Sequence, residues 1–380
     1  MSVSSLASLV SGREIIVCCG SGGVGKTTAA AAVAVEGARM GRRTCVVTID
    51  PARRLADALG LRSLTNTPRR VEGDWPGELW ALMLDTKGTF DDLVVRYAHD
   101  PQQARGILDN RLYRNLSVAL SGTQEYMAME KLYELHEEGG FDLIVVDTPP
   151  TRSALDFLSA PRRLTRFLDN RIFRLLVMPT RAYLRAVSVA TQAFLRTVAK
   201  VVGAEMVSDT VAFFKAFEGM EQGFRNRADR VLELLSQRST AFLLVASPRR
   251  DAVDEALFFA ERLGRSHIAV QGLIVNRLHP RFDAGSGAVS SVDSGRVSDS
   301  DTRPVAGTGD DARALDALRA NRDELGAMAE REEGHFAALA AQVAPAPVAR
   351  VPFLPADVHD LEGLAVIADH LFGRGQPAVA

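Results

Sequence analysis

The sequence predicts an α/β protein with a doubly wound, mostly parallel sheet and a helical insert subdomain. Short apolar runs alternate with helix-like segments, and a glycine-rich loop joins the first run to a helix. The runs show little alternation of apolar and polar residues, as expected of strands that helices cover on both faces. They are Ile15–Cys19, Thr44–Ile49, Leu79–Leu84, Leu143–Val146, Ala241–Ala246, Ile268–Val275 and Val348–Phe353.

The composition excludes several classes of protein. The chain of 380 residues is 47% hydrophobic and 24% charged, a profile typical of globular proteins. Its net charge of −2 provides no field that would attract nucleic acid, so we expect no nucleic-acid partner. The three cysteines, Cys18, Cys19 and Cys45, fall in the first two predicted strands, where we expect buried thiols. A disulfide framework and a C-x-x-C zinc site are both absent, so no zinc is expected.

The start of the chain and its hydropathy favour a cytoplasmic protein. Residues 1–12 lack the basic and apolar regions of a signal peptide. No apolar run approaches the roughly 18–20 residues that a membrane span needs. A peripheral role at a membrane remains open.

The first predicted strand ends in a run that fits the pattern G-x-x-x-x-G-K-[ST] without a gap. Glycines let backbone N–H groups approach phosphate oxygens, and the N-terminus of the following helix adds partial positive charge. A lysine in this position can reach the β- and γ-phosphates, and the next hydroxyl can bind Mg²⁺. The alternative is a glycine-rich turn without a ligand. The predicted phosphate-binding residues are Gly20, Ser21, Gly22, Gly23, Val24, Gly25, Lys26, Thr27 and Thr28.

Two aspartates follow predicted strands at the edge of the sheet where the loop lies. Asp147 ends the apolar run before Thr148-Pro149-Pro150, as the metal-binding aspartate of a nucleotide hydrolase does. Asp50 follows the second run and could orient or deprotonate an attacking water. Thr27, Asp50 and Asp147 are therefore the candidate metal-site residues, and Lys26 and Asp50 the candidate catalytic ones. Alternatively, Asp147 only caps the next turn and Asp50 only opens an Asp-Pro turn.

The organisation of the chain suggests a core in two parts. Residues 1–151 and 239–380 carry the predicted strands, and residues 152–238 form a helix-like insert without a convincing strand. Within the second part, residues 283–310 are rich in Ser, Gly and Asp, which predicts a flexible loop. A charged helical segment is expected from Asp311 to about Val343.

In combination, these motifs resemble those of the ArsA-type ATPases, which are P-loop NTPases with a deviant Walker A box. This family contains the arsenite-pump ATPase and the targeting factor for tail-anchored membrane proteins. The resemblance runs in order through residues 22–28, the first switch at 50–59 and the second switch at 147–151. It continues through Val275-Asn276-Arg277 and the segment Val351-Pro352-Phe353-Leu354-Pro355.

The resemblance implies an ATPase that binds Mg²⁺-ATP and hydrolyses it to drive switching of a dimer. It implies that Asn276 contacts adenine and that Pro352 and Phe353 belong to a loop that closes over the base. It implies a homodimer or a heterodimer with a paralogous ATPase subunit. The implied roles are targeting of a membrane-protein client, or anion transport with a membrane partner.

Three departures from the family pattern bear on function. Ser21 stands where family members usually carry a second lysine, which is thought to reach the partner's nucleotide. A heterodimer could supply that lysine, or the chain could be a slow, regulatory nucleotide-binding subunit, or serine could simply be tolerated. Arg152-Ser153 replaces the Gly-His that usually follows the second switch. The metal-binding cysteines of family members have no counterparts here, because no cysteine follows Cys45.

The insert carries apolar stripes at helical spacing, including Phe213, Phe217, Met220 and Phe224. These stripes could line a groove for an apolar client helix, or they could pack against neighbouring helices. Arginines between residues 162 and 185 could meet an anionic partner or simply form a solvated face. A membrane-partitioning ATPase would need a basic C-terminal helix, whereas Asp360–Phe372 is acidic to neutral.

Overall fold

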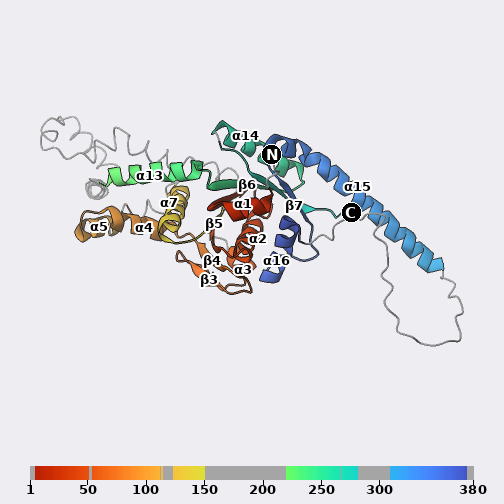
Figure 1. The fold of residues 1–380 in the computed structure, drawn as a ribbon, viewed down its shortest axis with the longest axis horizontal. Coiled ribbons are helices and arrows are strands. Elements are labelled where there is room, and N and C mark those ends of the chain that lie inside the picture. The colour runs from red at the N-terminus through yellow and green to blue at the C-terminus, as the bar shows by residue number, and fades with distance from the viewer. Residues whose placement is uncertain are drawn as a thin grey trace, which may run out of the picture.

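The computed structural model describes residues 5–50, 54–111, 113, 123–149, 220–266, 268–280 and 309–374. An eight-stranded sheet, in the order β3-β4-β2-β5-β1-β6-β7-β8, forms its centre (Figure 1). Every neighbouring pair is parallel except β3 with β4, which confirms the predicted fold class. The strands are β1 Ile15–Gly20, β2 Arg43–Thr48, β3 Arg69–Val71, β4 Glu78–Met83, β5 Leu143–Asp147, β6 Thr240–Ala246, β7 Gly272–Leu278 and β8 Val348–Pro352.

Helices cover both faces of the sheet. On one face lie α1 Leu6–Gly12, α2 Lys26–Arg39, α3 Arg54–Ala58 and α16 Leu361–Phe372. On the other lie α4 Thr86–Tyr97, α5 Pro101–Leu108, α7 Thr123–Glu138, α13 Glu221–Ser236, α14 Arg250–Arg265 and α15 Gly309–Val343. The long α15 runs from the edge of the core well beyond it (Figure 1).

The central strand β1 shows why the strands read as continuous apolar runs. Ile15 and Val17 belong to one hydrophobic core, whereas Ile16 and Cys18 belong to the core on the opposite face. Both faces of the strand are therefore removed from water, and neither needs a polar residue. The three cysteines are buried free thiols, as predicted, and burial raises the pKa of Cys19 to about 12.

The helix termini differ in a way that matters for the site. Helices α1, α4, α5 and α16 are preceded by the capping residues Ser5, Asp85, Asp100 and Asp360, whose side chains accept hydrogen bonds from N–H groups of the first turn. Helix α2 is preceded by Gly25, which has no side chain to accept such a bond. Its first N–H groups therefore stay available for a ligand.

Two strand predictions need correction. The predicted strand at Ile268–Val275 starts and ends too early in the sequence, because β7 begins at Gly272 and ends at Leu278. The N–H of Ile268 instead donates to the carbonyl of Leu263 and closes the end of α14. The short edge strand β3 has no counterpart in the prediction, since only Val71 of its three residues is buried and no apolar run marks it.

The insert predicted at 152–238 lies mostly outside the described residues, and so does the loop predicted at 283–310. The part of the insert that is described, α13, is helical as predicted, and α15 confirms the charged helix from Asp311 to Val343. The division into two core segments and an insert stays a prediction. Among the described residues, no helix has the length and apolar character needed to cross a membrane.

Candidate functional site

The glycine-rich loop forms a tight connection between β1 and α2. Gly25, the residue before α2, has φ 90°, in the left-handed region that favours glycine. A Cβ on Gly25 would lie 2.2 Å from Nδ2 of Asn276, so the close approach of β7 also requires glycine here. At the other end of the loop, a Cβ on Gly20 would lie 2.1 Å from the carbonyl oxygen of Val245. The backbone at both ends of the loop is thus in close contact with neighbouring strands.

Lys26 is the first residue of α2 and is largely buried. Its Nζ donates to the carbonyl oxygen of Ser21, 2.8 Å away, so the ammonium group lies against the loop. Burial lowers the pKa of Lys26, and the negative charge of Asp147 opposes that shift. A phosphate group near Nζ would restore the favourable environment for the charged form.

Asp147 lies at the end of β5 and is 1% exposed. Its Oδ2 accepts hydrogen bonds from the hydroxyls of Thr27, at 2.8 Å, and Thr48, at 2.9 Å. Its Oδ1 is buried and has no hydrogen-bond partner. Burial raises the pKa of Asp147 to about 6, against the opposing effect of the two threonine hydrogen bonds and of Lys26.

This arrangement fits a magnesium ion. A buried carboxylate oxygen without a partner is costly unless a cation or a donor satisfies it. Asp147 and the Thr27 hydroxyl supply hard oxygen ligands, and Mg²⁺ commonly combines one or two such protein ligands with substrate phosphates and water. Thr27 and Asp147 are 120 positions apart in the chain, and the parallel pairing of β1 with β5 brings them together.

Asp50 follows β2 at the same edge of the sheet. Its backbone N–H donates to the hydroxyl of Thr48, at 3.2 Å, and that hydroxyl also donates to Asp147. Its carboxylate lies 3.9 Å from the guanidinium of Arg54 on α3. Thr48 therefore links the two aspartates that the sequence singled out, and Asp50 lines the cavity described next.

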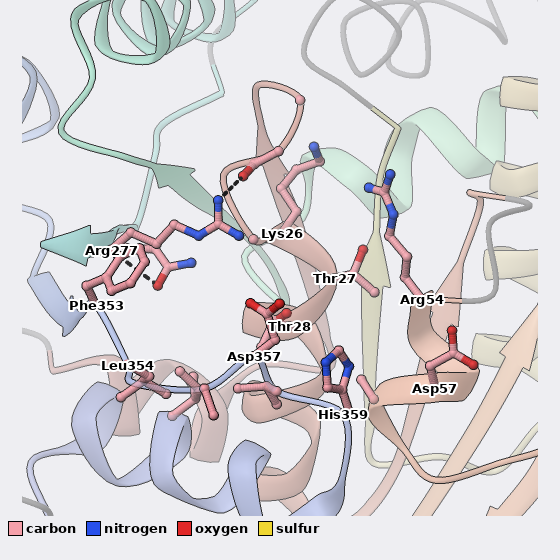
Figure 2. Close-up of a pocket in the computed structure, with 18 of the residues that line it drawn as sticks. Lys26, Thr27, Thr28, Arg54, Asp57, Arg277, Phe353, Leu354, Asp357 and His359 are labelled. Atoms are coloured by element: carbon pink, nitrogen blue, oxygen red, sulfur yellow. Dashed lines mark hydrogen bonds between the residues drawn. The ribbon is translucent and has the colours of Figure 1, made fainter.

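A cavity of about 470 Å³ opens beside the loop. This size lies within the roughly 300–1,000 Å³ typical of small-ligand sites. In Figure 2, Phe353 and Arg277 lie at one end of the cavity and Thr27 and Arg54 at the other. The sequence-predicted residues that line it are Gly22, Gly23, Gly25, Lys26, Thr27, Thr28, Asp50, Asn276, Pro352 and Phe353.

Four predicted residues lie behind this lining. Ser21, Val24 and Asp147 are buried, at 4%, 2% and 1% exposed, and Gly20 is buried at the end of β1. The hydroxyl of Ser21 has no hydrogen-bond partner, and the residue brings no charge to the cavity. Within the described residues, the loop therefore has one cationic side chain of its own, Lys26.

Asn276 lines the cavity, but the strand bounds predicted around it were wrong. It lies inside β7 rather than after it, because the strand continues to Leu278. Its Nδ2 donates to the carbonyl of Val24 in the loop, at 2.9 Å, and its Oδ1 accepts the N–H of Arg277, at 3.0 Å. The implied contact with adenine stays a prediction, and the second hydrogen of Nδ2 and the second lone pair of Oδ1 are the groups that could make it.

Several lining residues were not selected from the sequence. Arg54 and Arg277 lie inside the motifs at 50–59 and 275–277, beside residues that were selected. That position in the motifs could have identified them as site residues. Thr148 follows Asp147, and its hydroxyl donates to the carbonyl of Cys18 at 2.8 Å. Asp357 and His359 enter the cavity from the segment between β8 and α16, and no local pattern marks them.

Comparisons with known proteins agree with this geometry. A family model described as anion-transporting ATPase matches residues 13–289. The chain is 30% identical over 169 residues to "ATPase get3" of Aspergillus terreus (strain NIH 2624 / FGSC A1156), which covers 43% of this chain and 48% of that protein. It is 29% identical over 154 residues to "ATPase GET3" of Ajellomyces dermatitidis (strain ER-3 / ATCC MYA-2586), covering 40% and 44%. The chain thus spans about half the length of the curated relatives that it matches.

Proposed function

The chain belongs to the anion-transporting ATPase family, and on that premise we propose that it binds Mg²⁺-ATP in this cavity and hydrolyses it to ADP and phosphate. Membership of this family leads us to expect ATP hydrolysis, and the residues that line the cavity include groups suited to bind phosphate and Mg²⁺. Turnover then drives conformational switching of a dimer, formed either by two copies of the chain or with a paralogous subunit.

The observation that carries the proposal is the contact between Thr27 and Asp147 beneath the glycine loop. A phosphate loop alone is compatible with binding any phosphorylated ligand. A hydroxyl and a buried carboxylate with an unpartnered oxygen, placed behind such a loop, add the ligands of a divalent cation. A site for phosphate groups and a site for a divalent cation are two of the components that nucleotide hydrolysis requires, beside an oriented water.

Each residue then has a defined role. The N–H groups of the loop and of the first turn of α2 bind the β- and γ-phosphates, and Lys26 moves its Nζ from the Ser21 carbonyl to them. Thr27 and Asp147 hold Mg²⁺, which supplies neutralisation of charge on the phosphates when bound. Asp50 lines the cavity at the same sheet edge and orients or deprotonates the attacking water.

The switching serves either a membrane-protein client or an anion-transporting membrane partner. Two curated relatives of this chain are named "ATPase GET3" or "ATPase get3", while the family model carries the anion-transport description. A client chaperone would co-purify with apolar peptides, and an anion-pump motor would co-purify with a membrane protein. Affinity purification from detergent extracts followed by mass spectrometry separates the two outcomes.

The test of hydrolysis is Mg²⁺-dependent ATP turnover by the purified chain, compared with Lys26→Ala. Lys87→Ala is the matched control, since Lys87 lies on α4, is half exposed and does not line the cavity. We expect turnover in the native chain and in Lys87→Ala, and a loss of about 100-fold or more in Lys26→Ala. Equal ATP binding and turnover in all three would refute the proposal.

A second candidate function rests on Ser21. Its side chain is buried and uncharged, so the loop gains no second cation from this position. The chain would then be a nucleotide-binding regulatory subunit that an active paralogue completes. ATP binding without turnover in the isolated chain would favour this function, and brisk turnover would exclude it.

A further inference from the structure

The glycine loop is held from outside by two consecutive residues of β7. Asn276 donates through Nδ2 to the carbonyl of Val24, at 2.9 Å, and Arg277 donates through Nη1 to the carbonyl of Gly23, at 3.2 Å. Figure 2 shows the Arg277 side chain extended from the β7 side of the cavity toward the loop. Both bonds go to backbone carbonyls, and the two carbonyls belong to successive peptide units.

A β-bulge places these two side chains on the loop. The pairing of β7 with β8 is irregular between Asn276 and Leu278, so Arg277 is the extra residue. Arg277 has φ 64°, and it is the one non-glycine residue with positive φ among those that the structure describes. The side chain of the extra residue in a bulge does not follow the regular alternation between the two faces of the sheet. Non-glycine residues in this conformation are strained and cluster at ligand clamps.

Packing fixes this part of the loop at Val24, whose side chain is buried in a hydrophobic core, but not at Gly22 and Gly23. A Cβ added to Gly22 or Gly23 would meet no atom within 4 Å, and Gly23 has φ 77°. Glycine permits many backbone conformations, so where no neighbouring atoms pack against it, packing does not fix the orientation of its peptide units. The hydrogen bonds from Asn276 and Arg277 therefore add to the buried Val24 side chain by fixing the direction of the Gly23 and Val24 carbonyls.

Because the peptide bonds are trans, the direction of each carbonyl also sets the direction of the N–H group in the same peptide unit. In each unit the C=O and the following N–H point in opposite directions. Fixing the carbonyls of Gly23 and Val24 toward β7 therefore directs the N–H groups of Val24 and Gly25 away from it. These are two of the donors that a phosphate group meets in a loop of this type.

We propose that Arg277, together with Asn276, is a positioning residue that presets the N–H groups of the glycine loop for the ligand's phosphates. The inference rests on the proposed function and deepens it. Arg277 acts on the phosphates through the loop, so its effect is independent of the base. A direct contact with the base would instead make its effect depend on which nucleotide is bound.

The experiment measures binding of three magnesium complexes by calorimetry: ATP, GTP and inorganic tripolyphosphate, which has no base or ribose. The variants are Arg277→Gly, which removes both the guanidinium and the strain, and Arg277→Ala, which removes the guanidinium alone. Arg277→Lys keeps a donor, and Arg265→Ala, an exposed arginine of an ion pair on α14, controls for net charge.

We expect Arg277→Gly and Arg277→Ala to bind all three complexes about 5- to 20-fold more weakly, with the ATP-to-GTP ratio unchanged. Arg277→Lys recovers part of the loss, and Arg265→Ala shows none. The thermal midpoint of Arg277→Gly stays at or above the native value, because glycine adopts φ 64° without strain.

Four results would overturn the inference. Native affinity in Arg277→Gly would show that the loop does not need the guanidinium. A loss confined to ATP and GTP, with tripolyphosphate unaffected, would assign Arg277 to the base or ribose. A loss matched by a lower thermal midpoint in Arg277→Gly would assign it a general structural role. If the native chain binds none of the three complexes, the proposed function itself is wrong and the inference is overturned with it.

Discussion

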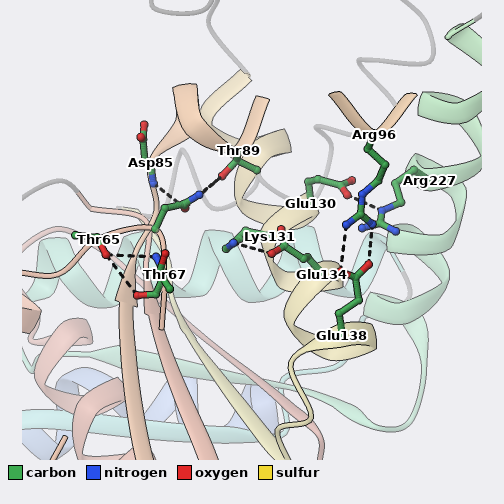
Figure 3. A network of polar contacts seen from close by, with 11 residues as sticks. Thr65, Thr67, Asp85, Thr89, Arg96, Glu130, Lys131, Glu134, Glu138 and Arg227 are labelled. Atoms are coloured by element: carbon green, nitrogen blue, oxygen red, sulfur yellow. Dashed lines mark hydrogen bonds and ion pairs between the residues drawn. The ribbon is translucent and has the colours of Figure 1, made fainter. Parts of the chain in front are cut away.

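Two buried carboxylates of this molecule, Asp147 and Glu130, have different hydrogen-bond partners. Both are about 1% exposed, burial raises the pKa of both, and each has one buried oxygen without a hydrogen-bond partner. Glu130 on α7 lies 2.5 Å from Nε of the buried Arg227 on α13, as Figure 3 shows. Asp147 has two threonine hydroxyls as its hydrogen-bond partners instead.

The difference lies in how the charge is compensated. Arg227 neutralises Glu130 directly, and its guanidinium also lies 4.0 Å from the ring centroid of Tyr133. This pair joins α13 to α7 and needs no further ligand to be neutral. Threonine hydroxyls orient Asp147 but add no charge. Lys26 favours its ionised form from nearby but donates its hydrogen bond to the carbonyl of Ser21, so Asp147 has no charged hydrogen-bond partner as Glu130 has. A buried carboxylate therefore indicates a ligand site when its partners are neutral, rather than when it is merely buried.

The largest effect is expected from breaking the structural pair. Arg227→Ala leaves Glu130 buried and uncompensated, which should cost about 3–5 kcal/mol of unfolding free energy. Urea denaturation measures it, and Arg230→Ala, on the same helix, is the control for loss of an arginine. Nucleotide affinity should change little as long as the variant is folded. A cost below about 1 kcal/mol would contradict the structural role of the pair.

Neutralising the other carboxylate should affect function and stability in opposite directions. Asp147→Asn removes a ligand of the cation, so we expect Mg²⁺-dependent turnover to fall about 100-fold or more. The same change removes a buried uncompensated charge and should stabilise the fold by about 1–3 kcal/mol at neutral pH. Turnover and urea denaturation are measured on the same preparation. A destabilised variant would show that Asp147 is compensated within the protein.

The pH dependence follows from the raised pKa of Asp147, about 6 in the fold. Because the unfolded pKa is lower, about 3.9, ionisation of this group costs stability as pH rises from about 4 to 6. Cation binding has the opposite dependence, since protons compete with Mg²⁺ below pH 6. We expect the Mg²⁺ concentration for half-maximal nucleotide binding to rise up to about tenfold per unit below pH 6. Asp147→Asn should lack this dependence, and a native curve that is flat from pH 5 to 7 would contradict it.

The smallest effect is expected from Thr48→Val, which keeps the shape of the side chain and removes one hydroxyl from Asp147. The hydrogen bond favours the ionised carboxylate, so its loss should raise the pKa of Asp147 further. We expect about a 2- to 5-fold higher Mg²⁺ requirement at pH 7, corresponding to about 1 kcal/mol. Thr44→Val is the control, because Thr44 lies on β2 and does not contact Asp147. Equal shifts in both variants would argue against a specific effect of Thr48.

The part of the site that is local in sequence could be predicted from the sequence. The strand, the glycine loop and the helix occupy residues 15–39 without interruption, so this motif can be identified from consecutive residues alone. The strands buried on both faces also read directly as apolar runs, because no position in them faces water. A sheet of parallel strands has all its carboxyl ends at one edge. The ends of β2 and β5, and hence Asp50 and Asp147, could therefore be assigned to the same edge.

Contacts between distant residues were decided by the tertiary structure alone. The pair Glu130–Arg227 joins residues 97 positions apart, and no pattern near either residue distinguishes it from a pair of solvated charges. The orientation of Arg277 depends on a bulge in the pairing of β7 with β8, two segments about 70 positions apart. Hydrophobic periodicity records which face of an element is buried, but not which polar group of another element meets it. The sequence therefore determined the glycine-rich loop and the fold class, and folding determined which buried carboxylate has a charged partner and which has neutral ones.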